Sequence, residues 1–123
     1  MSSQNNDVDL TILLPTYNEV LTIQNMLEAI RINVPDETIY EIIIVDDDSP
    51  DGTSEIANSY FDKLEKIIKH EVHVRKNKRG LSSAVIDGIK IACGKYVLVM
   101  DSDFSHPPEM IRKMYSKLSL IHI

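Results

Sequence analysis

The sequence contains a single cysteine, Cys93, so no disulfide can form within the chain, which fits a reducing compartment. Positive charge is also scarce. Thirteen lysines and arginines stand against 19 aspartates and glutamates, which gives a net charge of −6. This balance argues against a general nucleic-acid-binding or anionic-membrane-binding surface.

Long apolar runs are absent as well. None approaches the roughly 18 residues that a membrane-spanning helix needs. The N-terminal stretch MSSQNNDVD lacks the basic and then apolar pattern of a signal sequence. We therefore expect no transmembrane segment in this chain, so a function at a membrane would require something else to hold the protein there.

What the sequence does contain is enough for one domain with its own core: 123 residues, 43% of them hydrophobic and 26% charged. We expect a polar tail over residues 1–8, the domain over 9–117 and a C-terminal tail over 118–123. That last tail, LSLIHI, resembles a translated sequencing adapter, so we hypothesise that it is not native. Finding the same six residues in the source DNA would refute this.

Apolar runs alternate with segments of helical periodicity along the chain. The expected strands cover residues 10–15, 40–46, 70–75 and 95–101. The expected helices cover residues 23–34, 56–68, 81–92 and a stretch from 107 onward. Gly94 is placed to cap the end of the third helix. This order predicts an α/β fold, a parallel sheet with helices on both faces.

Polar residues follow each expected strand: PTYNE, DDDSPDGT, RKNKRGL and DSDFSHPP. In a parallel sheet, ligands bind at the carboxyl ends of the strands, and these four segments would meet there. The clustering predicts a binding site at that edge of the sheet.

Asp101 and Asp103 follow the fourth expected strand, one residue apart. In extended or turn geometry, residues i and i+2 point the same way, so both carboxylates can face one ion. Such oxygens suit Mg²⁺ or Mn²⁺, which would neutralise a diphosphate leaving group. The alternative is a helix-entry loop in which Asp or Ser caps a helix. We interpret the nearby His106 as a loop residue or a neighbour of the ligands rather than a metal ligand.

Asp46, Asp47 and Asp48 form a second acidic cluster, whose mutual repulsion costs stability unless each carboxylate is satisfied. Asp47 is the better candidate for binding a ribose hydroxyl or a base N–H. We interpret Asp48 and Asp51 as turn and cap residues, because SPDG is a turn sequence by itself.

Two further segments have two interpretations each. After the first strand, Tyr17 could stack on a base, or Asn18 could simply cap the next helix, with Glu19 favouring its positive end. The basic stretch RKNKR, residues 75–79, is either a solvated loop or, since it leads into Gly80 and a helix, a segment that faces phosphate.

Four motifs now stand in one order: LLPTYNE, YEIIIVDDDSPDGT, RKNKRGLSSAVIDG and GKYVLVMDSDFSHPPE. Together they resemble the family-2 inverting glycosyltransferases, most closely the dolichol-phosphate (polyprenol-phosphate) mannosyltransferases. The resemblance covers nearly everything from Leu10 to about Lys117. It departs in Ser102, where alanine is frequent, and in Asp48, where glycine or asparagine is common.

The resemblance implies the Rossmann-like donor-nucleotide half of a glycosyltransferase A-type fold. By position, it assigns nucleotide-sugar binding to Pro15, Tyr17, Glu19, Val45, Asp47, Ser102 and Asp103. It assigns metal binding and catalysis to Asp101 and Asp103, and it places the loop from Arg75 to Leu81 beside the phosphates. The acceptor-side half of such enzymes has no motif here, so we expect a chain truncated to the donor half.

The implied reaction is metal-dependent, inverting transfer of mannose from GDP-mannose to dolichyl (polyprenyl) phosphate, as used for glycan or GPI-anchor assembly. The implied location is the cytoplasmic face of a membrane, the endoplasmic reticulum in a eukaryote. There the protein would be peripheral, with possible membrane-anchoring partner subunits and no nucleic acid.

Several alternatives stay open from the sequence. A related enzyme could use UDP-glucose with a polyprenyl phosphate, and a truncated chain could bind nucleotide without catalysis. The run VLVMDSDFS also fits a haloacid-dehalogenase phosphatase with Asp101 as nucleophile. Against this, that motif belongs on the first strand and its later lysine and acidic pair are missing. A dinucleotide oxidoreductase is disfavoured because no G-x-G-x-x-G follows the first strand.

Overall fold

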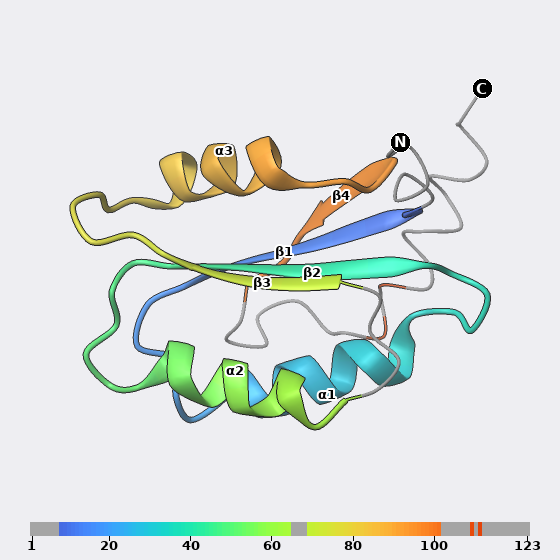
Figure 1. The fold of residues 1–123 in the computed structure, drawn as a ribbon, viewed down its shortest axis with the longest axis horizontal. Coiled ribbons are helices and arrows are strands. Elements are labelled where there is room, and N and C mark those ends of the chain that lie inside the picture. Colours follow the sequence, from blue (N-terminus) through green and yellow to red (C-terminus); the bar gives the residue numbers. More distant parts are fainter. Residues whose placement is uncertain (1–7, 65–68, 102–108, 110, 112–123) are drawn as a thin grey trace.

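The computed structural model describes residues 8–64, 69–101, 109 and 111. Strands and helices alternate along this part of the chain (Figure 1). The strands are β1 (Leu10–Thr16), β2 (Tyr40–Asp46), β3 (Lys69–Val74) and β4 (Tyr96–Val99). The helices are α1 (Ile23–Asn33), α2 (Thr53–Asp62) and α3 (Leu81–Ile91).

The described strands form one parallel sheet in the order β3-β2-β1-β4. Between the central strands, Leu10 pairs with Tyr40 and Thr16 with Asp46, so β1 and β2 end together. This confirms the predicted parallel α/β sheet. Because all strands run the same way, the loops that follow β1, β2 and β3 gather at one edge of the sheet, on the left in Figure 1.

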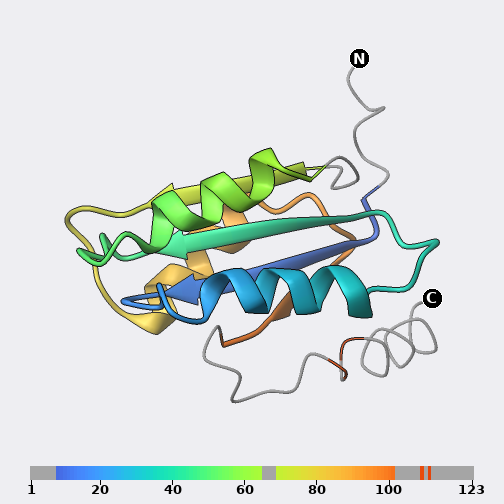
Figure 2. The ribbon, with the colours of Figure 1, turned by 90° about the horizontal axis from the view of Figure 1, so that it is seen from below.

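Helices cover both faces of the sheet: α1 and α2 lie on one face and α3 on the other (Figures 1 and 2). Along β1 and β2, side chains point alternately to the two faces of the sheet and so belong to two core clusters. Ile12 and Ile42 belong to the larger core cluster with α1 and α2, whereas Leu13 and Ile43 belong to a smaller cluster with α3. Burial on both faces is why these strands read as continuous apolar runs rather than alternating ones.

The strands begin and end where the pairing with neighbouring strands does, and these bounds differ slightly from those of the apolar runs in the sequence. β2 occupies residues 40–46, as expected, and β1 extends one residue further, to Thr16. β3 is an edge strand with mostly exposed side chains, and it lies one residue earlier than expected. β4 is shorter than expected, because its pairing with β1 ends where Leu13 meets Val99.

Helix α2 also ends earlier than the apolar stripe predicted. Lys63 and Leu64 donate backbone hydrogen bonds three residues back, to Tyr60 and Phe61, at 3.1 Å each. This i to i−3 pattern tightens the last turn and closes the helix. Residues 65–68, the end of the predicted helix, lie outside the described residues.

Of the fourth predicted helix, only Glu109 and Ile111 are described. Ile111 is helical and fully buried in the larger core cluster. The remainder of that prediction, and both predicted tails apart from Val8, lie outside the described residues. Within the described residues, no helix has the length and apolar character that a membrane span requires.

The predicted helix-capping role of Gly94 is wrong. Helix α3 ends at Ile91, the following Ala92 is already extended, and Gly94 does not have positive φ. Glycine is needed here for a close approach instead. The Gly94 N–H donates to Thr11 Oγ1 at 2.9 Å, and a Cβ on Gly94 would lie 2.5 Å from the Thr11 backbone nitrogen.

We expect Gly94→Ala to lower the free energy of unfolding by about 1–3 kcal/mol, the usual cost of forcing atoms into a filled site. The obstructing atom belongs to the backbone of a buried central strand, which has little freedom to move. Urea denaturation measures the effect. The neighbouring exposed Lys95→Ala serves as control and is expected to stay within about 0.5 kcal/mol of the parent. Equal stability of the two variants would contradict this packing argument.

Candidate functional site

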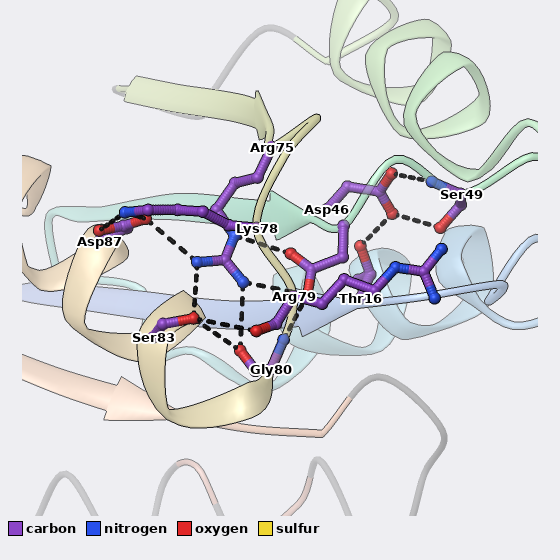
Figure 3. Close-up of polar contacts among 10 residues, drawn as sticks. Thr16, Asp46, Ser49, Arg75, Lys78, Arg79, Gly80, Ser83 and Asp87 are labelled. Atoms are coloured by element: carbon purple, nitrogen blue, oxygen red, sulfur yellow. Dashed lines mark hydrogen bonds and ion pairs between the residues drawn. The ribbon is translucent and has the colours of Figure 1, made fainter.

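The carboxyl-end edge of the sheet carries a connected polar network. Thr16 and Asp46 end the two central strands, while Arg75, Lys78 and Arg79 come from the loop after β3 (Figure 3). The start of α3 closes the network from the other side. The structure therefore brings together the loops that follow β1, β2 and β3, as the sequence predicted.

Asp47 and Arg75 form the buried centre of this network. Arg75 Nε donates to Asp47 Oδ1 at 2.7 Å, and Arg75 Nη2 donates to Asp47 Oδ2 at 3.0 Å. The Gly80 N–H adds a third bond to Asp47 Oδ2, at 3.1 Å. The Arg75 side chain is 2% exposed and that of Asp47 12%. A bidentate pair at this depth is well shielded from water and salt.

The rest of the Arg75 guanidinium binds the first turns of α3. Nη1 donates to Ser83 Oγ at 2.9 Å and to Asp87 Oδ2 at 3.1 Å, and Nη2 also donates to the Gly80 carbonyl at 3.1 Å (Figure 3). The hydrogen bond to Asp47, together with the one to Asp87, raises the pKa of Arg75. Arg75 is thus neither a solvated loop residue nor turned toward an outside phosphate, and it joins the end of β2 to the start of α3.

Arg79 and Tyr17 connect the loops after β3 and β1. The Arg79 guanidinium carbon lies 4.6 Å from the centroid of the Tyr17 ring, and Arg79 Nη2 donates to the Tyr17 hydroxyl at 3.2 Å. Tyr17 is 40% exposed. One face of the ring is therefore covered by a cation, so a base that stacks on Tyr17 must use the other face or displace Arg79.

Each carboxylate of the acidic triplet has its own partner. The side chain of Asp46 accepts hydrogen bonds from Thr16 Oγ1 at 2.6 Å, Ser49 Oγ at 2.6 Å and Ser49 N–H at 2.8 Å. Asp47 binds Arg75, and Asp48 lies 3.6 Å from Lys76 at the exposed surface. Each of the three carboxylates thus has the partner that the sequence analysis required. The Asp46 carboxylate is bonded within the strand end and its turn, whereas Asp47 and Asp48 each pair with a basic side chain.

The turn roles predicted for Asp48 and Asp51 are confirmed. Asp48 has φ of 58°, in the left-handed region that favours glycine and asparagine. Asp51 Oδ1 accepts the Thr53 N–H at 3.1 Å, two residues ahead, as in an Asx turn, and Asp51 Oδ2 accepts the Val20 N–H at 3.1 Å. The predicted capping role of Asp51 is wrong, because the N-cap of α2 is Gly52.

The predicted capping role of Asn18 is wrong, because α1 begins at Ile23 and its N-cap is Thr22, four residues after Asn18. Asn18 adopts φ of 57°, and its N–H donates to Ser49 Oγ at 2.8 Å. The Glu19 N–H donates to Thr53 Oγ1 at 3.0 Å. These bonds fasten the loop after β1 to the loop after β2.

Of the remaining predicted site residues, some lie within the described part of the chain and others lie outside it. Pro15 lies in β1, and Val45 is fully buried in the α3-side cluster, so its side chain faces the core. Asp101 is half-buried and lies two residues after the end of β4 at Val99. Ser102, Asp103 and His106 lie outside the described residues. The described residues include no group of three or more His, Cys, Asp or Glu that could hold a metal. The two-aspartate metal site therefore stays a prediction.

Sequence reasoning missed Ser83 and Asp87. Both lie on α3 four residues apart, so they share one helix face. That polar pair at i and i+4 was the available signal. Asp87 Oδ2 also accepts a hydrogen bond from Lys78 Nζ at 3.1 Å. Hydrogen bonds from Lys78 and then Arg75 hold the pKa of Asp87 below its usual value.

These contacts predict an acid-sensitive fold. The pKa of Asp51 is also lowered: burial alone would raise it, but hydrogen bonds from Thr53 and Val20 outweigh that effect. A depressed pKa contributes stability above the unfolded value of about 3.9, and that stability is lost as pH falls through the lower folded value. We expect the melting temperature to fall below about pH 4.

The matched variant is Asp87→Asn. It should melt lower than the parent at neutral pH, and the two melting curves should converge as the pH drops toward full protonation of Asp87. Parallel curves over the whole pH range would contradict a role for the Asp87 carboxylate.

Comparison with known proteins identifies the family. The model of glycosyl transferase family 2 matches residues 11–120. The chain belongs to this family. A dolichol-phosphate mannosyltransferase of Pyrococcus furiosus is 42% identical over 106 residues, which cover 85% of this chain and 28% of that protein. One of Saccharomyces cerevisiae is 34% identical over 113 residues, which cover 90% of this chain and 41% of that protein.

The solved structures agree with the glycosyltransferase A-type fold. A mannosyltransferase of Pyrobaculum calidifontis, solved with GDP-Man and Mn²⁺, superposes with a TM-score of 0.69 at 26% identity. It covers 76% of this chain, and this chain covers 27% of it. This family-2 glycosyltransferase chain therefore spans well under half the length of each relative named here.

Proposed function

We propose that the protein transfers mannose from GDP-mannose to dolichyl or polyprenyl phosphate, with inversion at the sugar carbon. The observation that carries this proposal is the similarity, at 42% and 34% identity, to two relatives that are both named dolichol-phosphate mannosyltransferase. The GDP-Man complex of the Pyrobaculum neighbour supports the same donor. The polar network at the carboxyl-end edge of the sheet is where this donor would bind.

Asp47 is the residue whose geometry suits donor recognition best. Of its two carboxylate oxygens, Oδ2 accepts two hydrogen bonds, while Oδ1 accepts one, from Arg75 Nε. A carboxylate oxygen has room for two, so Oδ1 can take one more from a ribose hydroxyl or a base N–H. Arg75 and Gly80 hold Asp47 in one orientation before the donor arrives, which reduces the ordering cost of binding.

Asp101 and Asp103 would hold Mg²⁺ or Mn²⁺ beside the donor diphosphate. Carboxylate oxygens are ligands for both Mg²⁺ and Mn²⁺, and the half-buried Asp101 lies at the strand end where this ion would bind. When bound, the ion would offset the negative charge of the departing GDP. The acceptor phosphate is already an anion, so its attack on the sugar needs no strong general base. A single displacement inverts the sugar carbon.

The proposed acceptor is a lipid, so we propose that the protein works at the cytoplasmic face of a membrane, the endoplasmic reticulum in a eukaryotic cell. Membrane-anchoring partner subunits would bring it there. The product, a lipid-linked mannose, would serve glycan or GPI-anchor assembly.

The test is an assay of sugar transfer to lipid. The purified protein is incubated with polyprenyl phosphate, Mn²⁺ and either GDP-mannose or UDP-glucose, each labelled in the sugar, and label in the organic phase is counted. The proposal expects transfer from GDP-mannose and background counts from UDP-glucose. Transfer from UDP-glucose alone would replace the mannosyltransferase by the glucosyltransferase alternative. Inorganic phosphate in the aqueous phase, measured colorimetrically in the same reactions, without label in the lipid would favour the phosphatase interpretation.

A further inference from the structure

We propose that Cys93 and Lys69 form an oxidation site at which peroxide joins the two side chains covalently. Lys69 is the first residue of β3, and Cys93 lies between α3 and β4, at the edge of the sheet opposite to the donor-site loops (Figure 1). Lys69 Nζ donates a hydrogen bond to Cys93 Sγ at 3.1 Å. Cys93 is exposed and the Lys69 side chain is 46% exposed, so a small oxidant can reach both.

The buried Glu41 holds this pair in place. Glu41 stands opposite Lys69 in the parallel register of β2 and β3, and its side chain is fully buried. Its Oε2 accepts the Cys93 N–H at 2.5 Å and the Thr11 hydroxyl at 2.5 Å, which fixes the backbone that carries the thiol. The cysteine is therefore held at a set position next to the start of β3 rather than on a free loop.

The second oxygen of Glu41 faces the lysine. Oε1 is buried, receives no hydrogen bond within the described part of the chain, and lies 3.8 Å from Lys69 Nζ. A buried carboxylate oxygen without a hydrogen-bond donor is costly. The joined state loses the positive charge that lies 3.8 Å from this oxygen and keeps one N–H beside it as a hydrogen-bond donor.

Peroxide oxidises the thiolate form of a cysteine. The hydrogen bond to Cys93 raises the pKa of Lys69. Because the sequence contains one cysteine, the oxidised sulfur has no second thiol in its own chain. The Lys69 nitrogen is the nucleophile placed next to it.

The chemistry balances in two steps. In the first, the Cys93 thiolate attacks one oxygen of hydrogen peroxide, the O–O bond breaks, and the departing hydroxide takes a proton from the Lys69 ammonium to become water. This leaves a sulfenic acid beside a neutral amine. In the second, the Lys69 nitrogen attacks the sulfur, an N–S bond forms and the S–O bond breaks. The hydroxyl group leaves with one amine proton as water. Peroxide takes up the two electrons, and the protein loses two hydrogens.

The test uses intact-mass and peptide-mapping mass spectrometry on the purified chain treated with hydrogen peroxide in slight excess. We expect a product about 2 Da lighter than the thiol form, in which the Lys69 peptide is joined to the Cys93 peptide and which dithiothreitol restores. Lys69→Arg keeps the positive charge but removes the nucleophilic amine, so it should stop at sulfenic acid, about 16 Da heavier. Lys95→Arg, at an exposed lysine two residues from Cys93, is the matched control and should still form the link.

Three results would overturn the proposal. One is a disulfide-linked dimer as the main product of the folded chain. Another is sulfinic acid without a joined peptide. The third is an equal yield of the lighter product from Lys69→Arg. The urea-unfolded chain, in which the pair is no longer held together, should give no link, and a link formed equally well there would also count against the site.

Discussion

Arg75→Met is expected to lower the free energy of unfolding by about 3–5 kcal/mol, the usual cost of removing one partner of a buried ion pair. The substitution leaves Asp47 with a single hydrogen-bond donor to its side chain, the Gly80 N–H, in a position that is nearly closed to water. It also removes the side chain that ties Asp87 and Ser83 to the end of β2. Urea denaturation followed by circular dichroism measures the loss.

The matched control is Lys76→Met. This residue is the next one along the chain and also pairs with an aspartate of the acidic triplet, Asp48, at 3.6 Å. Its side chain is 74% exposed, so the pair is screened by water and its loss should cost less than about 1 kcal/mol. Arg75→Lys should fall between the two, because lysine keeps the charge but loses the bidentate fork. Equal effects of Arg75→Met and Lys76→Met would contradict the buried-anchor role.

Asp101→Ala is expected to reduce mannose transfer to background, because it would remove one of the two carboxylates proposed to hold the divalent ion. Asp101 is half-buried and lies two residues after the carboxyl end of β4, which places it at the same edge of the parallel sheet as Asp47 and Arg75. The assay is transfer of labelled mannose to polyprenyl phosphate over a range of Mn²⁺ concentrations.

Asp36→Ala controls for the loss of one acidic residue. Asp36 is exposed and lies between α1 and β2, at the opposite edge of the sheet, so its variant should keep the parent rate. A parent-like rate from Asp101→Ala, with the same dependence on Mn²⁺, would refute the metal-binding role of this residue.

The sequence predicted the sheet well because its signals are local. The run YEIIIVD is β-branched and continuous, and it forms β2 over the expected seven residues, Tyr40–Asp46. The turn roles of Asp48 and Asp51 could also be predicted, because they depend on the left-handed backbone of Asp48 and on the bond from Asp51 to the Thr53 N–H, two residues ahead. Family membership followed from the order and separation of four such local motifs.

What the sequence did not predict depends on contacts between distant residues. Gly94 follows a helix, as a capping glycine would, yet it is needed because it packs against Thr11, 83 residues away in the chain. Arg75 stands within a basic stretch, yet its partner Asp47 comes from another strand end, 28 residues away. Side chains of one type can face solvent, a ligand or each other, and only the fold decides among these.

The central claim is that the carboxyl-end edge of this sheet is a donor-nucleotide site. Calorimetric titration of GDP-mannose, and separately UDP-glucose, into the purified chain with and without Mn²⁺ tests it most directly. The account predicts saturable binding of GDP-mannose that requires Mn²⁺ and is lost in Asp101→Ala. If a chain that is folded by circular dichroism binds neither nucleotide in the presence of Mn²⁺, the claim is contradicted.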